Sequence, residues 1–120
     1  MKELHLGTVE ARFAEIIWQN APLSSAELAM RAEEVIGWKK TTSYTVLKRL
    51  CDKGLFQNEK GTVSVLMTRE DFEARKSEQF VEESFQGSLP AFLAAFTSRR
   101  GLSKEEVAQL RRMVEQYEEG

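Results

Sequence analysis

The chain has 120 residues, of which 42% are hydrophobic, and its formal net charge is −2. This length suffices for one modest domain with a smaller module, and the slight negative charge argues against a protein that coats nucleic acid without regard to sequence. The N-terminus lacks the apolar segment of a signal peptide and no apolar run approaches a membrane span, so we expect a cytoplasmic protein with no direct membrane insertion.

Two amphipathic helices are predicted in the first third of the chain. The first begins near Thr8 and is ended by Pro22, and its apolar stripe comprises Val9, Phe13, Ile16 and Ile17. The run Ser24-Ser25-Ala26-Glu27 is a capping box, so the second helix begins near Ser25. Before both helices, the alternation in residues 4–6 predicts a short strand that could join a later sheet.

A third helix, within residues 37–54, has two unlike faces. Its apolar stripe consists of Val46, Leu47, Leu50 and Cys51, and Gly54 ends the helix. The opposite face carries short hydroxyl side chains followed by mostly cationic ones, with Tyr44 at its margin. Its residues are Thr41, Thr42, Thr45, Lys48, Arg49 and Asp52. Threonine suits base edges in the major groove, and lysine and arginine suit phosphates or guanine. Considered alone, however, the helix is better explained as an ordinary solvated surface helix.

The residues after this helix favour DNA binding. The run LFQNEKGTVSVLM contains two β-prone segments around Lys60-Gly61, so a hairpin follows the helix directly and completes a winged helix-turn-helix arrangement. Residues 37–60 hold six cations and two anions, a local net charge of +4. We therefore expect base contacts from Thr41, Thr42, Tyr44 and Thr45, and phosphate contacts from Lys39, Lys40, Lys48, Arg49 and Lys60.

Three more helices are predicted after the hairpin. The fourth begins near Thr68 and runs to Gly87, the fifth follows Gly87, and the sixth starts at a capping box around Ser103. Five of the seven phenylalanines lie in this tail, which is too short to bury them alone, so we expect a homodimer. The expected dimerisation residues are Phe80, Phe85, Leu89, Phe92, Leu93, Phe96, Val107, Leu110 and Val114. The alternative is a monomer whose tail folds back on the wing.

Five segments, taken in order, resemble the BlaI/MecI/CopY family of bacterial transcriptional repressors. They are TVEARFAEIIW, PLSSAELA, WKKTTSYTVLKRLCDKGL, GSLPAFLAAF and LSKEEVAQLRRMV. With the predicted elements, the resemblance implies a mainly α fold with a small antiparallel β-wing, in which residues 1–68 form a winged helix-turn-helix DNA-binding domain and residues 69–120 a helical dimerisation domain. It implies repression from a pseudo-palindromic double-stranded DNA operator that controls genes such as those for β-lactam resistance or copper handling. It also places Thr41, Thr42, Tyr44 and Thr45 at recognition-helix positions and Arg49 at a backbone contact.

The chain departs from the family pattern at three places. The β-lactam-responsive members are cleaved in the fifth helix before a phenylalanine, usually after an asparagine, which implies a membrane sensor protease that triggers derepression. The matching bond, and so the possible proteolytic site, is Ala95-Phe96. The copper-responsive members carry a C-terminal cysteine cluster, whereas this sequence ends RRMVEQYEEG, so we do not expect copper release through that device. Ser43 stands on the core-facing side of the third helix, where members commonly have a branched apolar residue.

Two other functional classes are alternatives to a repressor. A winged-helix protein–protein interaction adaptor is the alternative, because a fold does not fix a function, although the +4 segment argues against it. His5 is the single histidine, and no triad or metal-ligand spacing is present, so we expect no catalysis, no metal and no cofactor. The lone Cys51 cannot form an internal disulfide and is expected to pack as a small hydrophobic residue.

Overall fold

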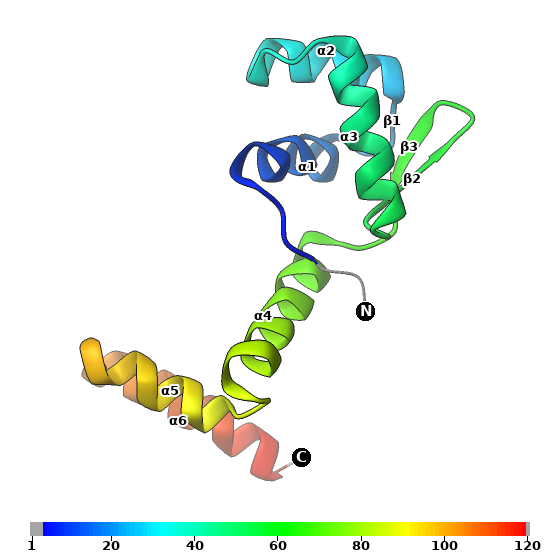
Figure 1. Cartoon of the computed structure of the whole chain (residues 1–120). Helices are drawn as coiled ribbons and strands as arrows, with labels where there is room; N and C mark the ends of the chain where they lie inside the picture. The colour runs from blue at the N-terminus through cyan, green and yellow to red at the C-terminus, as the bar shows by residue number, and fades with distance from the viewer. Residues whose placement is uncertain (1–3, 120) are drawn as a thin grey trace. The chain divides into compact units, whose positions relative to one another are not determined.

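The structure is a computed structural model that describes residues 4–119 (Figure 1). Its elements, in chain order, are α1 (Thr8–Asn20), β1 (Leu23–Ser24), α2 (Ser25–Ile36), α3 (Lys40–Asp52), β2 (Phe56–Glu59), β3 (Thr62–Val65), α4 (Arg69–Phe85), α5 (Leu89–Arg99) and α6 (Lys104–Glu119). The predicted fold class, mainly α with a small antiparallel sheet, is confirmed. The chain forms two compact units whose boundary falls between Ser77 and Glu78, inside α4.

Side-chain caps begin the helices where the sequence predicted them. Ser24 Oγ accepts a hydrogen bond from the Glu27 backbone N–H at 3.0 Å at the start of α2. Thr68 Oγ1 accepts from the Asp71 N–H at 3.1 Å at the start of α4. Such bonds satisfy amide groups that have no partner within the first turn of a helix, so they fix where each helix begins.

The start of α6 is a reciprocal capping box. Ser103 Oγ accepts from the Glu106 N–H at 3.1 Å, and the Glu106 carboxylate accepts from the Ser103 N–H at 3.0 Å. The hydrogen bond from the Ser103 N–H is the larger cause, and that from the Arg100 guanidinium the next, of a pKa of the Glu106 carboxyl below its ordinary value. The carboxylate is therefore the form that the helix start binds.

The sheet has the strand order β1-β3-β2, and both of its strand pairs are antiparallel. Leu23 of β1 lies opposite Val63 of β3, and both side chains are buried. The prediction that residues 4–6 form the extra strand is therefore wrong. The short segment β1, between α1 and α2, occupies the edge of β3 that such a strand would have used, and Leu4 is buried in the core.

The first unit has a single apolar core built by α1, α2, α3, the hairpin and the start of α4. Its most enclosed large side chains are Phe13, Ile17, Leu28, Leu50, Leu55, Phe56 and Val63. The ring of Trp38 lies 5.1 Å from that of Phe13 and so braces the turn between α2 and α3. Val9, predicted on the buried stripe of the first helix, is 42% exposed, because it lies in the first turn of α1.

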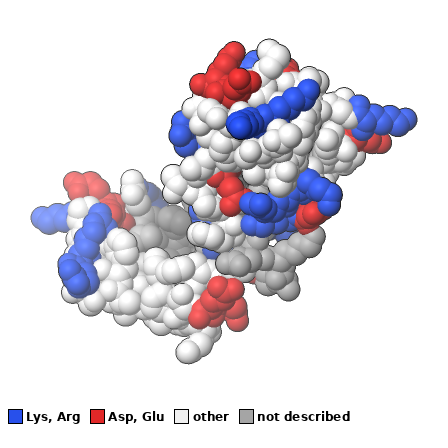
Figure 2. Space-filling view, turned by 45° about the horizontal axis from the view of Figure 1, so that its top comes forward, with Lys and Arg blue, Asp and Glu red and all other residues white. Residues whose placement is uncertain are grey.

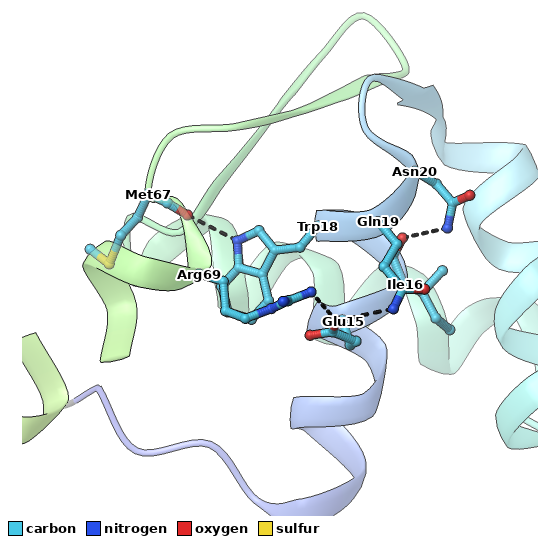
Figure 3. Close-up of polar contacts among 7 residues, drawn as sticks. All are labelled: Glu15, Ile16, Trp18, Gln19, Asn20, Met67 and Arg69. Atoms are coloured by element: carbon cyan, nitrogen blue, oxygen red, sulfur yellow. Dashed lines mark hydrogen bonds and ion pairs between the residues drawn. The ribbon is translucent and has the colours of Figure 1, made fainter. Parts of the chain in front are cut away.

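Trp18 joins α1 to the segment that leads into α4 (Figure 3). Its indole Nε1 donates a hydrogen bond to the Met67 carbonyl oxygen at 3.0 Å, and its ring lies 5.6 Å from that of the buried Phe72. Arg69, the first residue of α4, forms an ion pair with Glu15 of α1. These contacts hold the first turns of α4 against α1, within the first unit.

Ser43 is buried on the core-facing side of α3, as the sequence predicted. Its side chain is 2% exposed, and its Oγ has no hydrogen-bond partner. A buried hydroxyl that loses its water and gains no partner costs about 1–3 kcal/mol of stability. Ser43 is therefore a weak point in an otherwise apolar interface.

We expect Ser43→Ala to raise the free energy of unfolding by about 1–2 kcal/mol, because it removes the unpaired hydroxyl and favours the helix. Ser77→Ala is the matched control, since Ser77 is exposed in α4 and its Oγ donates to the Glu73 carbonyl at 2.8 Å. Chemical denaturation at one fixed protein concentration measures both variants. An equal gain in the two variants would mean that helix propensity alone is responsible.

Candidate nucleic-acid interface

The polar face predicted for the third helix is exposed on α3. The helix begins at Lys40, with Lys39 as its N-cap, inside the predicted range of residues 37–54. Buried Val46, Leu47 and Leu50 hold the opposite side in the core. The exposed members of the predicted face are Thr41, Thr42, Thr45, Lys48, Arg49 and Asp52, while Tyr44 is half-buried. The structure thus brings together all the residues predicted to contact bases; that contact itself stays a prediction.

The threonines of this face are partly ordered by the helix itself. Thr45 Oγ1 donates a hydrogen bond to the Thr41 carbonyl oxygen at 3.0 Å. With its proton directed to the backbone, the Thr45 oxygen keeps lone pairs that can accept from a donor outside the helix. At the start of α3, Lys40 Nζ lies 5.8 Å from the centre of the Tyr44 ring. The hydroxyl and aromatic groups therefore have defined directions on an exposed surface.

Lys60 stands apart from α3, in the turn of the wing. It occupies the turn between β2 and β3 with a positive φ of 52°, followed by Gly61 at 83°, and its side chain is exposed. The tip of the hairpin projects away from α1, α2 and α3 in Figure 1. The structure thus carries this predicted phosphate contact on a different element from the rest.

On the face shown in Figure 2, Lys and Arg side chains form several separate groups and acidic side chains lie among them. Lys48 Nζ lies 3.8 Å from the Asp52 carboxylate, and both side chains are mostly exposed. Arg49 Nη1 lies 3.3 Å from the Glu10 carboxylate of α1. Exposed ion pairs stabilise a fold by about 0–1 kcal/mol, so the Lys48 ammonium can exchange its carboxylate for another anion at little cost.

Sequence reasoning missed the contacts between the N-terminal segment and the last turns of α3. Lys53 Nζ donates to the His5 carbonyl oxygen at 2.9 Å, across 48 positions of the chain. The Arg49–Glu10 pair spans 39 positions. Neither contact belongs to a helical or strand repeat, so no periodic signal could have revealed it.

Cys51 is half-buried at the edge of the core, as expected of a small hydrophobic residue. Burial raises the pKa of its thiol; a hydrogen bond from the Asn58 backbone opposes this rise, and the charge of Asp52 adds to it. The protonated thiol is therefore the dominant form at neutral pH, and its nucleophilicity is low.

Within residues 4–119, no group of three or more His, Cys, Asp or Glu side chains could hold a metal ion. No helix in the same range is long and apolar enough to cross a membrane. The single histidine, His5, is exposed and precedes α1.

The second unit leaves its apolar side chains at least partly accessible. None of residues 78–118 is buried. The rings of Phe80, Phe85 and Phe92 contact one another within the chain, with centres 5.5–5.9 Å apart. Of the predicted dimerisation residues, the exposed ones are Phe80, Leu89, Phe96, Val107 and Val114, and the half-buried ones are Phe85, Phe92, Leu93 and Leu110.

We expect the Cys51 thiol to react slowly with iodoacetamide at neutral pH, because its raised pKa leaves little thiolate and its side chain is half-buried. The same chain in denaturant is the control, since its thiol has an ordinary pKa. The alkylation rate should rise more steeply toward high pH in the folded chain. Equal rates in the folded and denatured chain would contradict the assignment.

Known proteins resemble the chain over both units. A family model described as penicillinase repressor matches residues 6–116. The penicillinase repressor of Bacillus licheniformis is 25% identical over 122 aligned positions, covering 98% of this chain and 95% of the relative. The methicillin resistance regulatory protein MecI of Staphylococcus aureus is 22% identical over 117 positions, covering 94% of this chain and 95% of that protein. The MecI protein of Mammaliicoccus sciuri is 21% identical with the same coverage.

Proposed function

Because the chain belongs to the penicillinase repressor (BlaI/MecI) family of DNA-binding transcriptional repressors, which are not enzymes, we propose that it represses transcription as a homodimer on a pseudo-palindromic double-stranded DNA operator. The observation that carries the proposal is the exposed threonine-and-cation face of α3, with its opposite side buried and a wing beside it. Nothing in the structure favours the adaptor alternative over this function.

In the proposed complex α3 lies in the major groove. Hydroxyl and methyl groups of its threonines meet base edges, and Tyr44 lies at the margin of the contact. Cations at the two ends of the face meet phosphates, and Lys60 of the wing reaches the neighbouring backbone. The proposed base contacts are Thr41, Thr42, Tyr44 and Thr45, and the proposed phosphate contacts are Lys39, Lys40, Lys48, Arg49 and Lys60.

We assign DNA binding to residues 1–68 and dimerisation to residues 69–120. The support for a dimer is the apolar surface that the second unit leaves accessible, including Val114 at 56% and Phe96 at 41% exposure. A monomer rarely leaves such a surface uncovered, and a second copy related by a twofold axis would bury it. The same axis would present two α3 helices to two half-sites.

For derepression, the family likeness points to a membrane sensor protease as the partner and to the Ala95–Phe96 bond as its target. Both residues are exposed, but they lie inside α5, where the Phe96 carbonyl accepts a hydrogen bond from the Arg100 N–H at 3.2 Å. Cleavage at this bond would require the last turns of α5 to open first.

We expect operator binding to be salt-sensitive, and Arg49→Ala to weaken binding to every duplex while the slope of log affinity against log salt falls by about 0.9. Thr45→Ala should instead relax discrimination at one base pair. Thr97→Ala is its control, since Thr97 of α5 makes the same type of bond, to the Leu93 carbonyl at 2.8 Å, and is not among the proposed DNA contacts. Gel shifts with fragments selected from the source genome and with scrambled duplexes measure these effects.

Equal binding of selected and scrambled duplexes at moderate salt would refute sequence-specific repression and leave the protein–protein interaction adaptor as the alternative. If Arg49→Ala and Thr45→Ala both left binding intact, a different surface would have to contact DNA.

We expect Val114→Asp to shift the protein toward the monomer, because it places a charge on the accessible apolar stripe of α6. Gln109→Asp adds the same charge at an exposed polar position of α6 and should leave the assembly unchanged. Sedimentation equilibrium measures the association constant of both variants. A wild-type chain that is monomeric at micromolar concentration would contradict the dimer.

A further inference from the structure

One ion pair of the first unit connects the proposed DNA-contacting helix to a different element. Arg49 Nη1 of α3 donates to the Glu10 carboxylate of α1 at 3.3 Å. The Glu10 side chain is 24% exposed, whereas that of Arg49 is 53% exposed. The carboxylate is thus the more fixed partner, and the guanidinium is the group that faces solvent.

Local structure places the Glu10 carboxylate independently of Arg49. Glu10 lies in the first turn of α1, and its Oε1 accepts from the Gly7 N–H at 3.5 Å. Negative charge is favourable at this end of a helix, where amide groups point outward. Beside it, Lys53 Nζ donates to the His5 carbonyl at 2.9 Å, so the segment before α1 follows the last turns of α3.

The other cation–carboxylate pair on α3 is different. Lys48 and Asp52 are one turn apart on the same helix, 3.8 Å from each other, and their side chains are 81% and 69% exposed. Such a pair restricts neither side chain strongly. Arg49 alone, among the phosphate contacts proposed on α3, has a salt-bridge partner on a second element among the described residues.

We propose that Glu10 is a positioning residue for the DNA contact of Arg49. The guanidinium presents five donors in a planar fork, so it can keep one bond to Glu10 while its other edge meets a phosphate. Holding the fork in place before binding removes part of the rotamer freedom that the complex would otherwise have to restrict. The inference rests on the proposed DNA-binding function and adds a residue of α1 that does not itself contact DNA.

The test is the affinity of the full-length chain for an operator fragment selected from the source genome. Glu10→Gln is expected to weaken binding about threefold to tenfold, because the neutral amide holds the guanidinium less firmly. Glu73→Gln is the matched control, since it removes the same charge from an exposed ion pair on α4, 3.3 Å from Lys76. Glu73→Gln should change the affinity by less than about twofold.

A double-mutant cycle separates positioning from a general effect on the fold. In the Arg49→Ala background, Glu10→Gln should cause no further loss, because a positioning residue acts only through the group it holds. An equal loss in both backgrounds would overturn the inference and assign Glu10 to the stability of α1. If Glu10→Gln bound as tightly as Glu73→Gln, the carboxylate would have no role in binding, and the inference would be overturned. If it bound more tightly, the carboxylate would compete with phosphate, which would also overturn the inference.

The proposed function can fail separately. A wild-type chain that does not distinguish the selected fragment from a scrambled one removes both the function and the inference. If the wild-type chain binds selectively and Arg49→Ala has the same affinity, the proposed function stands and the role of Glu10 is overturned.

Discussion

The structure depends on how α3 divides its two sides between the core and the solvent. Leu50 and Leu47 are enclosed almost completely, while Thr45 and Arg49, on the same turns, are exposed. The bonds made by the exposed side chains are local or weak, so they cannot set the direction of the helix. Burial of the apolar stripe sets it, because rotation of α3 would place those side chains in water. The display of the polar face follows from the packing of the opposite one.

Helix α1 has a role beyond filling the core. Its first turn carries Glu10, which pairs with α3, and its last turns carry Glu15 and Trp18, which contact the start of α4. Helix α1 therefore contacts α3, which we propose binds DNA, near one end and the start of α4 near the other. A Trp N–H with a carbonyl partner and a ring among other rings gives that second contact a defined geometry. Substitutions in α1 would consequently affect its contacts with α3 and α4 as well as the stability of α1 itself.

Local chemistry made much of this fold predictable. Capping side chains such as Ser24 and Thr68 marked helix starts, glycine after α3 marked its end, and the Lys60-Gly61 pair marked the wing. Contacts between distant segments were not predictable, because periodicity reports which face is apolar but not what lies against it. The extra strand was therefore assigned to residues 4–6, although a two-residue segment after α1, too short for any alternation signal, pairs with β3. The ion pairs of Glu10 and Glu15 were missed for the same reason.

The second unit shows how phenylalanine side chains can be ordered without being fully buried. Phe80, Phe85 and Phe92 contact one another edge to face, which orients their rings while Phe80 stays exposed and the other two are only half-buried. The second unit comprises only the end of α4, α5 and α6, and so small a unit has little interior in which to enclose rings of this size. In the assembly we propose, the ring contacts would shape a preformed apolar face and the second copy would supply the burial. The ring contacts would then lower the ordering cost of association, because the side chains are already held in place before the partner arrives.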